Sequence, residues 1–236
     1  MVSIGGIGTI IGVIGYWIFT YNQEQRKDYI NRLTQIRGVP MKFWLIACSL
    51  PLLILLLSQI INKLSGNFSA PIGLINTGFV ENGWIYVLFL FLFGPVPEEL
   101  AWRGIALDEL SKKSKLKAQI IVALMWGLWH LPLFFIKGSY QNSLGVGTIS
   151  FWMFFLNVIF PSFIVGWLYL KSNCSILIAI FYHFSLNLTG EMFYTTTQVD
   201  IVSTILTILV ALLLLLEQIV SSKKQITLVE IEVIDK

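Results

Sequence analysis

The chain has 236 residues, of which 56% are hydrophobic and 12% charged, and its mean hydropathy is +0.78. A soluble domain of this length needs far more charge on its surface, so the composition excludes a soluble globular protein and indicates a polytopic helical membrane protein. The net charge of +3 is too small to indicate a nucleic-acid partner.

Apolar segments long enough to span a bilayer, about 20 residues each, recur along the whole chain. In chain order, the predicted spans are roughly Ile4–Tyr21, Phe43–Ile61, Trp84–Leu107, Ala118–Ile136, Thr148–Leu170, Cys174–Tyr194 and Ile201–Val220. Because they follow one another closely, we predict an all-α fold: a single membrane domain over residues 1–236, built as a bundle of about seven transmembrane helices. Residues 84–194 are its predicted core, and residues 221–236 are a predicted cytoplasmic tail.

The first apolar segment is expected to be a retained helix rather than a signal peptide. No Lys or Arg precedes it and no clear cleavage site follows it. The segment is rich in glycine, and the spacing of Gly8 and Gly12 fits close packing against another helix. The polar stretch Gln23–Arg37 that follows has two interpretations, a basic amphipathic helix on the inner leaflet or a solvated loop.

Lys and Arg residues are concentrated in alternate connections, which predicts how the helices are oriented. The basic connections are those after the first, third and fifth spans, together with the C-terminal tail. They hold Arg26, Lys27, Arg32, Arg37, Lys42, Lys112, Lys113, Lys115, Lys117, Lys171, Lys223, Lys224 and Lys236, whereas the opposite side holds Lys63 and Lys137. This alternation predicts a cell-membrane protein with its N-terminus outside and its C-terminus in the cytoplasm.

Ionisable residues inside spanning segments cost about 2.5 to 3.5 kcal/mol each and are therefore candidates for function. At about 1.5 Å of rise per residue, Glu98 and His183 each lie about 14 Å from the cytoplasmic end of their helices, and His130 about 18 Å. Asn187 lies one turn deeper than His183. Three separate helices thus place polar side chains in one layer on the cytoplasmic side of the midplane, where each finds a partner.

Spacing separates the roles of two adjacent carboxylates. Glu99 and Arg103 are four residues apart on a helix, in the order that favours an ion pair. Glu98 is rotated by about 100° from Glu99 around the helix axis, so it is free to face a cavity and act as a general base. Pro95 and Pro97 remove backbone donors just before the pair, which predicts that a new helical segment begins there.

His183 and Asn187 are also four residues apart and project from the same helix face. An imidazole and an amide side by side can donate hydrogen bonds to a developing oxyanion. The imidazole could instead bind a metal or simply pack. A second helix break is predicted at Pro132, two residues after His130.

Three short motifs collect these residues in order along the chain. They are Glu98-Glu99-x-x-x-Arg103, Trp126-x-x-x-His130 and His183-x-x-x-Asn187. Together they resemble the motifs EExxxR, FxxxH and HxxxN/B of the CPBP intramembrane proteases, which include the CAAX prenyl endopeptidases and the bacteriocin-processing or self-immunity (Abi) proteins. The resemblance covers residues 98–187 and departs from the family at Trp126, where Phe is usual.

The resemblance implies an intramembrane endopeptidase that acts on a membrane-associated peptide or lipidated protein, of the prenylated CAAX or bacteriocin type. By that resemblance Glu98 would activate the attacking water with help from His130. His183 and Asn187 would stabilise the oxyanion, and the remaining two motif residues, Glu99 and Arg103, would hold the first motif in place. The lipid bilayer is the other expected partner.

The family has been labelled as metalloproteases, but a glutamate-based mechanism that requires no metal also fits the motifs. If a metal is present, Glu98, His130 and His183 are the candidate ligands, and zinc is the candidate ion. The sequence contains no HExxH zinc motif and no serine or aspartyl intramembrane-protease motif.

Two other functions use the same residues. A membrane immunity or scaffold protein would bind a peptide or a partner without cleaving it. A small transporter or proton relay would also bury Glu and His, but it predicts polar residues at several depths along a path rather than in one layer.

Overall fold

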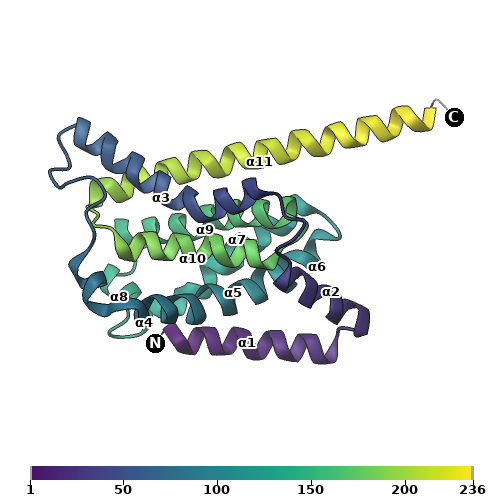
Figure 1. Cartoon of the computed structure of the whole chain (residues 1–236), viewed down its shortest axis with the longest axis horizontal. Helices are drawn as coiled ribbons and strands as arrows, with labels where there is room; N and C mark the ends of the chain where they lie inside the picture. Colours follow the sequence, from purple (N-terminus) through teal and green to yellow (C-terminus); the bar gives the residue numbers. More distant parts are fainter. Residues whose placement is uncertain (1, 235–236) are drawn as a thin grey trace.

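A computed structural model of the chain describes the backbone of residues 2–234 and the side chains of residues 6–221. Over this range the regular elements are helical, as predicted, and Figure 1 shows them running roughly side by side. The α-helices are α1 (Val2–Phe19), α2 (Gln23–Thr34), α3 (Met41–Leu64), α4 (Thr77–Phe93), α5 (Pro95–Ala101), α6 (Asp108–Ser111), α7 (Lys115–His130), α8 (Tyr140–Leu144), α9 (Ile149–Lys171), α10 (Ile176–Met192) and α11 (Thr197–Ile234). A π-helix, η1 (Trp102–Leu107), and a 3₁₀-helix, η2 (Leu131–Phe135), complete the set.

Five of the helical stretches are long and apolar enough to cross a membrane. They are Met41–Leu64, Thr77–Ser111, Lys115–Phe135, Ile149–Lys171 and Thr197–Ser221, and the apolar helices Gly6–Phe19 and Ile176–Met192 are shorter. These seven stretches coincide with the seven predicted spans. The chain is therefore a multi-pass helical membrane protein.

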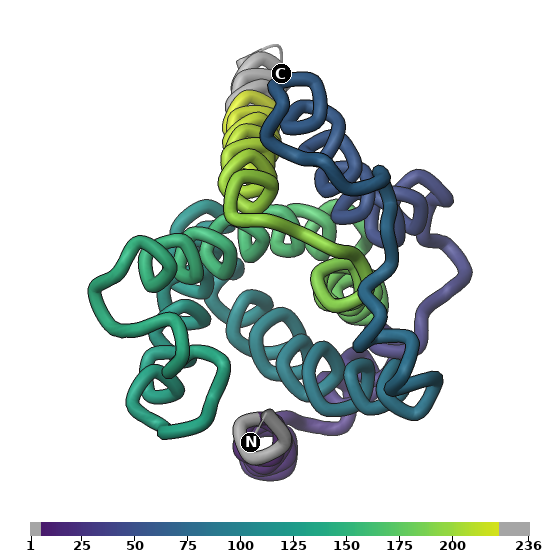
Figure 2. The backbone as a smooth tube through the Cα atoms, turned by 90° about the vertical axis from the view of Figure 1, so that its left-hand side faces the viewer, coloured from purple at the N-terminus to yellow at the C-terminus, as the bar shows by residue number. Residues whose placement is uncertain are grey.

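The central helix of the bundle is α10, which packs against α3, α4, α5 and α9. In the end-on view of Figure 2, α10 lies between α3 and the α4–α5 stretch. Its residues Ala179, Tyr182 and His183 are buried, although the helix is too short to meet the length expected of a span. Burial among other helices removes the need for α10 to match the bilayer thickness by itself.

On the edge of the bundle, α1 lies against α4 and α5 (Figure 1). The close approach is at Gly6, where an added Cβ would lie 2.9 Å from the Phe93 carbonyl oxygen and 3.1 Å from Cγ of Pro97. An added Cβ at Gly12 would meet nothing within 4 Å. An added Cβ at Gly8 would lie 3.9 Å from the ring of Trp129, an ordinary contact, so the closest approach of α1 is at Gly6 rather than at the predicted Gly8 and Gly12.

The predicted span Trp84–Leu107 begins earlier, at Thr77, and is divided. Gly94 has φ −110° and ψ −87°, which ends α4, and Pro95 begins α5, as the two prolines predicted. The π-helix η1 follows directly after α5. The second predicted break is also present, because α7 ends at His130 and the segment containing Pro132 is a 3₁₀-helix.

The stretch Gln23–Arg37 contains a helix, α2, which begins with a capping box at Asn22. One face of α2 packs against the protein: the Tyr29 hydroxyl donates a hydrogen bond to the Leu100 carbonyl oxygen at 2.9 Å. Arg32 is buried and donates to the hydroxyl of Tyr169. Burial favours its neutral form, but Tyr169, Asp108 and Asp28 together raise the pKa of Arg32 above its usual value, so it stays charged.

At the other end of the chain, α11 continues past the predicted span. Its backbone is helical to Ile234, so the predicted tail that starts at residue 221 begins as a continuation of that helix. Residues 235–236 lie outside the described range.

Candidate active site

Glu98 and Glu99 lie on α5, just after the break at Gly94, and they point to different surroundings. Glu99 is fully buried, whereas Glu98 is only partly buried. Their side chains diverge because successive residues on a helix are rotated by about 100°. One carboxylate is thus enclosed by protein, and the other borders accessible space.

The carboxylate of Glu99 forms a buried ion pair with Arg103. Their Oε1 and Nη1 atoms are 2.9 Å apart, and both side chains are fully buried. Nη2 of Arg103 also donates to Ser162 of α9, at 2.8 Å to its hydroxyl and 3.3 Å to its carbonyl oxygen. These contacts tie the first motif to α9, and sequence spacing predicted the ion pair but not Ser162.

His183 also contacts Glu99, from the central helix α10. Its Nδ1 atom lies 2.8 Å from Oε1 of Glu99, and the side chain is almost fully buried. An ionised carboxylate only accepts hydrogen bonds, so Nδ1 carries the proton. The Nε2 atom is therefore the one available to a substrate, as an acceptor in the neutral ring and as a donor in the charged ring.

His130 is the last residue of α7 and is partly buried. Its Nδ1 atom lies 2.8 Å from the backbone carbonyl oxygen of Trp126. A carbonyl oxygen only accepts, so Nδ1 donates here and Nε2 keeps a free lone pair. The helix α7 ends at His130, two residues before Pro132. The His130 ring packs against the ring of Phe154 at a centroid distance of 5.5 Å.

Trp126 joins the three motifs. Its Nε1 atom donates to Oε2 of Glu98 at 2.7 Å. Its ring lies 5.1 Å from that of His183 and 5.9 Å from that of His130, both edge-on, and the Cζ atom of Arg103 lies 4.8 Å above it. In the sequence, Trp126 stands out only as the aromatic residue of the second motif. Its indole N–H is the signal that could have identified it as a hydrogen-bond donor within the site.

Asn187 lies one turn beyond His183 on α10 and is partly buried. Its Nδ2 atom would lie 3.4 Å from a Cβ added at Gly94, so the amide sits close to the break between α4 and α5. No hydrogen bond to its side chain occurs among the described residues. The amide is therefore available to a ligand at this point.

The candidate metal ligands do not form a metal site. Among the described residues, no three His, Cys, Asp or Glu side chains are placed so that together they could hold a metal ion. Glu98, His130 and His183 thus do not fit a zinc site, and no step below is derived through a metal.

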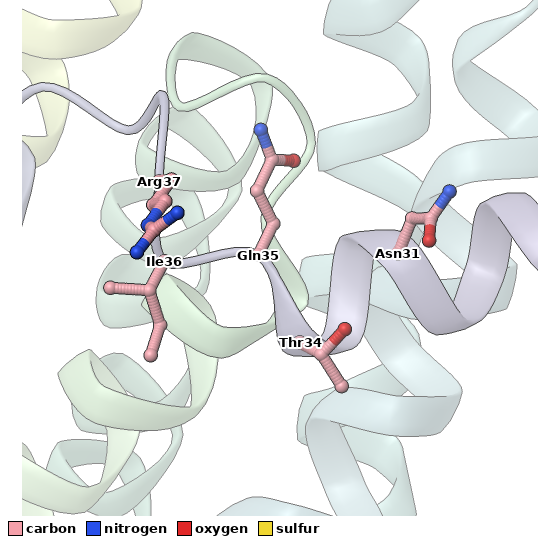
Figure 3. A pocket seen from close by; sticks show the side chains of 5 residues that line it. All are labelled: Asn31, Thr34, Gln35, Ile36 and Arg37. Carbon is pink, nitrogen blue, oxygen red and sulfur yellow. The ribbon is translucent and has the colours of Figure 1, made fainter.

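A separate hollow of about 630 Å³ lies at the end of α2. It is lined by Asn31, Thr34, Gln35, Ile36 and Arg37 (Figure 3). These residues belong to α2 and to the connection toward α3, and none of them belongs to the three motifs. The hollow is therefore distinct from the candidate active site.

The chain also matches known proteins. Residues 80–189, which contain all three motifs, match the family described as type II CAAX prenyl endopeptidase Rce1-like. The chain is 36% identical over 204 residues to a protein of Methanococcus maripaludis named CAAX prenyl protease 2, and the alignment covers 83% of this chain and 73% of that protein. The resemblance to CAAX prenyl endopeptidases that the motifs indicated is confirmed by both matches.

Proposed function

Because the chain belongs to the Rce1-like family of type II CAAX prenyl endopeptidases, we propose that it is a membrane endopeptidase for proteins that end in a prenylated CAAX sequence. The observation that carries the proposal is the meeting of three motifs at one point. Glu98 of α5, His130 of α7 and His183 of α10 are all joined through Trp126. A water held there is within reach of a base and of hydrogen-bond donors, as peptide hydrolysis requires.

Glu98 is the proposed general base. One oxygen of its carboxylate is held by Trp126, and the other is free to take a proton from water. The water oxygen attacks the carbonyl carbon of the scissile bond as Glu98 takes the proton. His130 accepts a hydrogen bond from the same water through Nε2, which orients its lone pair toward the carbon.

Asn187 and His183 are the proposed donors to the oxyanion. The amide of Asn187 donates through Nδ2, and His183 donates through Nε2 when its ring is charged. The carboxylate of Glu99 on Nδ1 holds the ring so that Nε2 is the nitrogen presented to the substrate. When the tetrahedral intermediate collapses, the carbon–nitrogen bond breaks and Glu98 returns its proton to the leaving amine.

We place the proposed site in the cytoplasmic half of the cell membrane. Figure 1 shows α2 and α6 at the same end of the bundle, and the basic residues between α6 and α7 follow directly. An excess of Lys and Arg marks the cytoplasmic side. This orientation places the N-terminus outside and the C-terminus in the cytoplasm, where prenylated proteins attach to the inner leaflet.

The test is cleavage of synthetic peptides by purified protein in liposomes. Three peptides are compared by mass spectrometry of the products: a farnesylated CAAX peptide, the same peptide without the lipid, and a bacteriocin-type leader peptide. Glu98→Ala is expected to lower kcat/KM for the farnesylated peptide roughly 10²- to 10⁴-fold, the contribution of a general base. Glu191→Ala, which removes an exposed carboxylate elsewhere on α10, is the matched control and should leave kcat/KM unchanged.

Equal cleavage by Glu98→Ala and the parent protein would show that the proposed base is wrong. Faster cleavage of the leader peptide than of the farnesylated peptide would overturn the proposed substrate class. Absence of cleavage of all three peptides by the parent protein would contradict the endopeptidase function.

A further inference from the structure

The surroundings of Glu98 differ from those of Glu99 in one chemical respect. Glu99 is neutralised by a cation, Arg103, at 2.9 Å. Glu98 instead accepts a hydrogen bond from an uncharged donor, the indole N–H of Trp126, at 2.7 Å. An uncharged donor fixes the position of a carboxylate without pairing it with a cation.

We propose that Trp126 is a positioning residue of this site: its indole N–H holds one oxygen of Glu98, so that the other oxygen faces the attacking water. The inference rests on the proposed hydrolytic function, and it adds the residue that orients the general base, Glu98. The Phe that is usual at this motif position would supply a ring but no donor. The indole N–H is therefore a feature of this chain beyond the shared motif.

The ring of Trp126 is itself held rigidly, which is what a positioning residue requires. It is 3% exposed, and the guanidinium of Arg103 lies over its face with Cζ 4.8 Å from the ring centroid. The rings of His183 and His130 meet it edge-on, at interplanar angles of 73° and 66°. With a guanidinium over its face and two rings packed against it, the indole ring is held in one orientation, which fixes the direction of the N–H.

Arg103 consequently acts on both carboxylates by different routes. It pairs directly with Glu99, and through the ring of Trp126 it supports the donor that holds Glu98. Its own place is fixed by Ser162 of α9. The geometry of the proposed base therefore depends on a chain of contacts that crosses α9, η1, α7 and α5.

The test removes the N–H and leaves the ring. Trp126→Phe removes both the donor and some bulk, whereas β-(3-benzothienyl)alanine at position 126 keeps the bicyclic shape and carries sulfur in place of the N–H. Both variants are expected to lower kcat for the farnesylated CAAX peptide roughly 10- to 100-fold, because one charge-assisted hydrogen bond is lost. KM should change by less than about threefold, because the group acts on the reacting water and not on substrate binding.

The matched control is Trp129→Phe. Trp129 lies on the same helix, is 39% exposed, and contacts Trp102 rather than the site residues. Its substitution should leave kcat unchanged. In a Glu98→Ala background, Trp126→Phe should cause no further loss of kcat, because the group that it positions is already absent.

A second measurement does not depend on turnover. In ¹⁵N-labelled protein in detergent, the indole N–H resonance of Trp126 is assigned as the one that is missing from the spectrum of Trp126→Phe. Its chemical shift reports the hydrogen bond to Glu98 directly. It should move upfield in Glu98→Ala and stay in place in Glu191→Ala. If the parent protein cleaves no peptide, the proposed function fails while this resonance still tests the contact.

Three results would overturn the proposal. The first is a benzothienylalanine variant that turns over as fast as the parent protein, since bulk rather than the N–H would then matter. The second is a rise in KM with kcat unchanged. The third is an indole resonance that does not respond to Glu98→Ala.

Discussion

Arg103 is a fully buried cation, and its removal has a calculable cost. Replacing it by Met keeps a long side chain but removes the 2.9 Å ion pair with Glu99 and the hydrogen bonds to Ser162. Glu99 would remain buried as a charge without its cation. Breaking a buried pair in this way costs about 3–5 kcal/mol of the free energy of unfolding, more than the pair itself contributes.

The assay is equilibrium unfolding in mixed detergent and SDS micelles, followed by tryptophan fluorescence. Lys112→Met is the matched control, because Lys112 pairs with Glu109 at 2.6 Å but its side chain is 57% exposed. That substitution should cost less than about 1 kcal/mol. Adding Glu99→Gln to Arg103→Met should recover much of the lost stability, since the unpaired charge is then removed as well.

A loss below about 1 kcal/mol for Arg103→Met would refute the reasoning, because it would mean that Glu99 is not dependent on its cation. A double variant that is less stable than Arg103→Met alone would refute it in another way. It would show that the shape of the pair, and not its charge balance, holds the first motif.

Three further predictions concern the approach to the site, the docking of α2 and metal dependence. Gly94→Ala would place a Cβ 3.2 Å from the Leu90 carbonyl oxygen, with Nδ2 of Asn187 at 3.4 Å, and should lower kcat/KM roughly tenfold by shifting the break between α4 and α5 beside that amide. Gly12→Ala, with nothing within 4 Å, is its control, and equal activity of the two would show that the site does not depend on the close packing at this break. Arg32→Leu removes the contact with Tyr169 and should speed proteolysis within α2 roughly tenfold, and an unchanged rate would mean that α2 is held by other contacts. EDTA should leave kcat/KM within about twofold, because no three donors converge among the described residues, and activity restored by added zinc after EDTA inactivation would disprove this.

Local spacing along single helices could be predicted from the sequence. The ion pair of Glu99 with Arg103 and the helix start at Pro95 follow from contacts within a few residues of one another. Long apolar runs likewise gave the seven spans, because lipid demands helices of that length.

Contacts between helices could not be predicted in the same way. They depend on the rotation of each helix about its axis, and an apolar pattern does not fix that rotation when the surrounding lipid is as apolar as the core. His183 was expected to stand beside Asn187, and it does, but its bond to Glu99 comes from a different helix. The donation from Trp126 to Glu98 and the close contact at Gly6 are of the same kind.

Charge balance explains how such a site can lie inside a membrane and still change its charges during a reaction. The site holds two carboxylates and one guanidinium, and Arg103 is paired with one of the carboxylates, Glu99. In the proposed mechanism Glu98 loses its charge as it takes a proton, and the substrate oxygen gains one, so the total stays constant. The charge moves from a carboxylate held by Trp126 to an oxygen held by Asn187 and His183. Hydrogen-bond donors are already in place around the carboxylate and around the oxyanion. The protein therefore does not have to reorient dipoles as the charge moves, as water would.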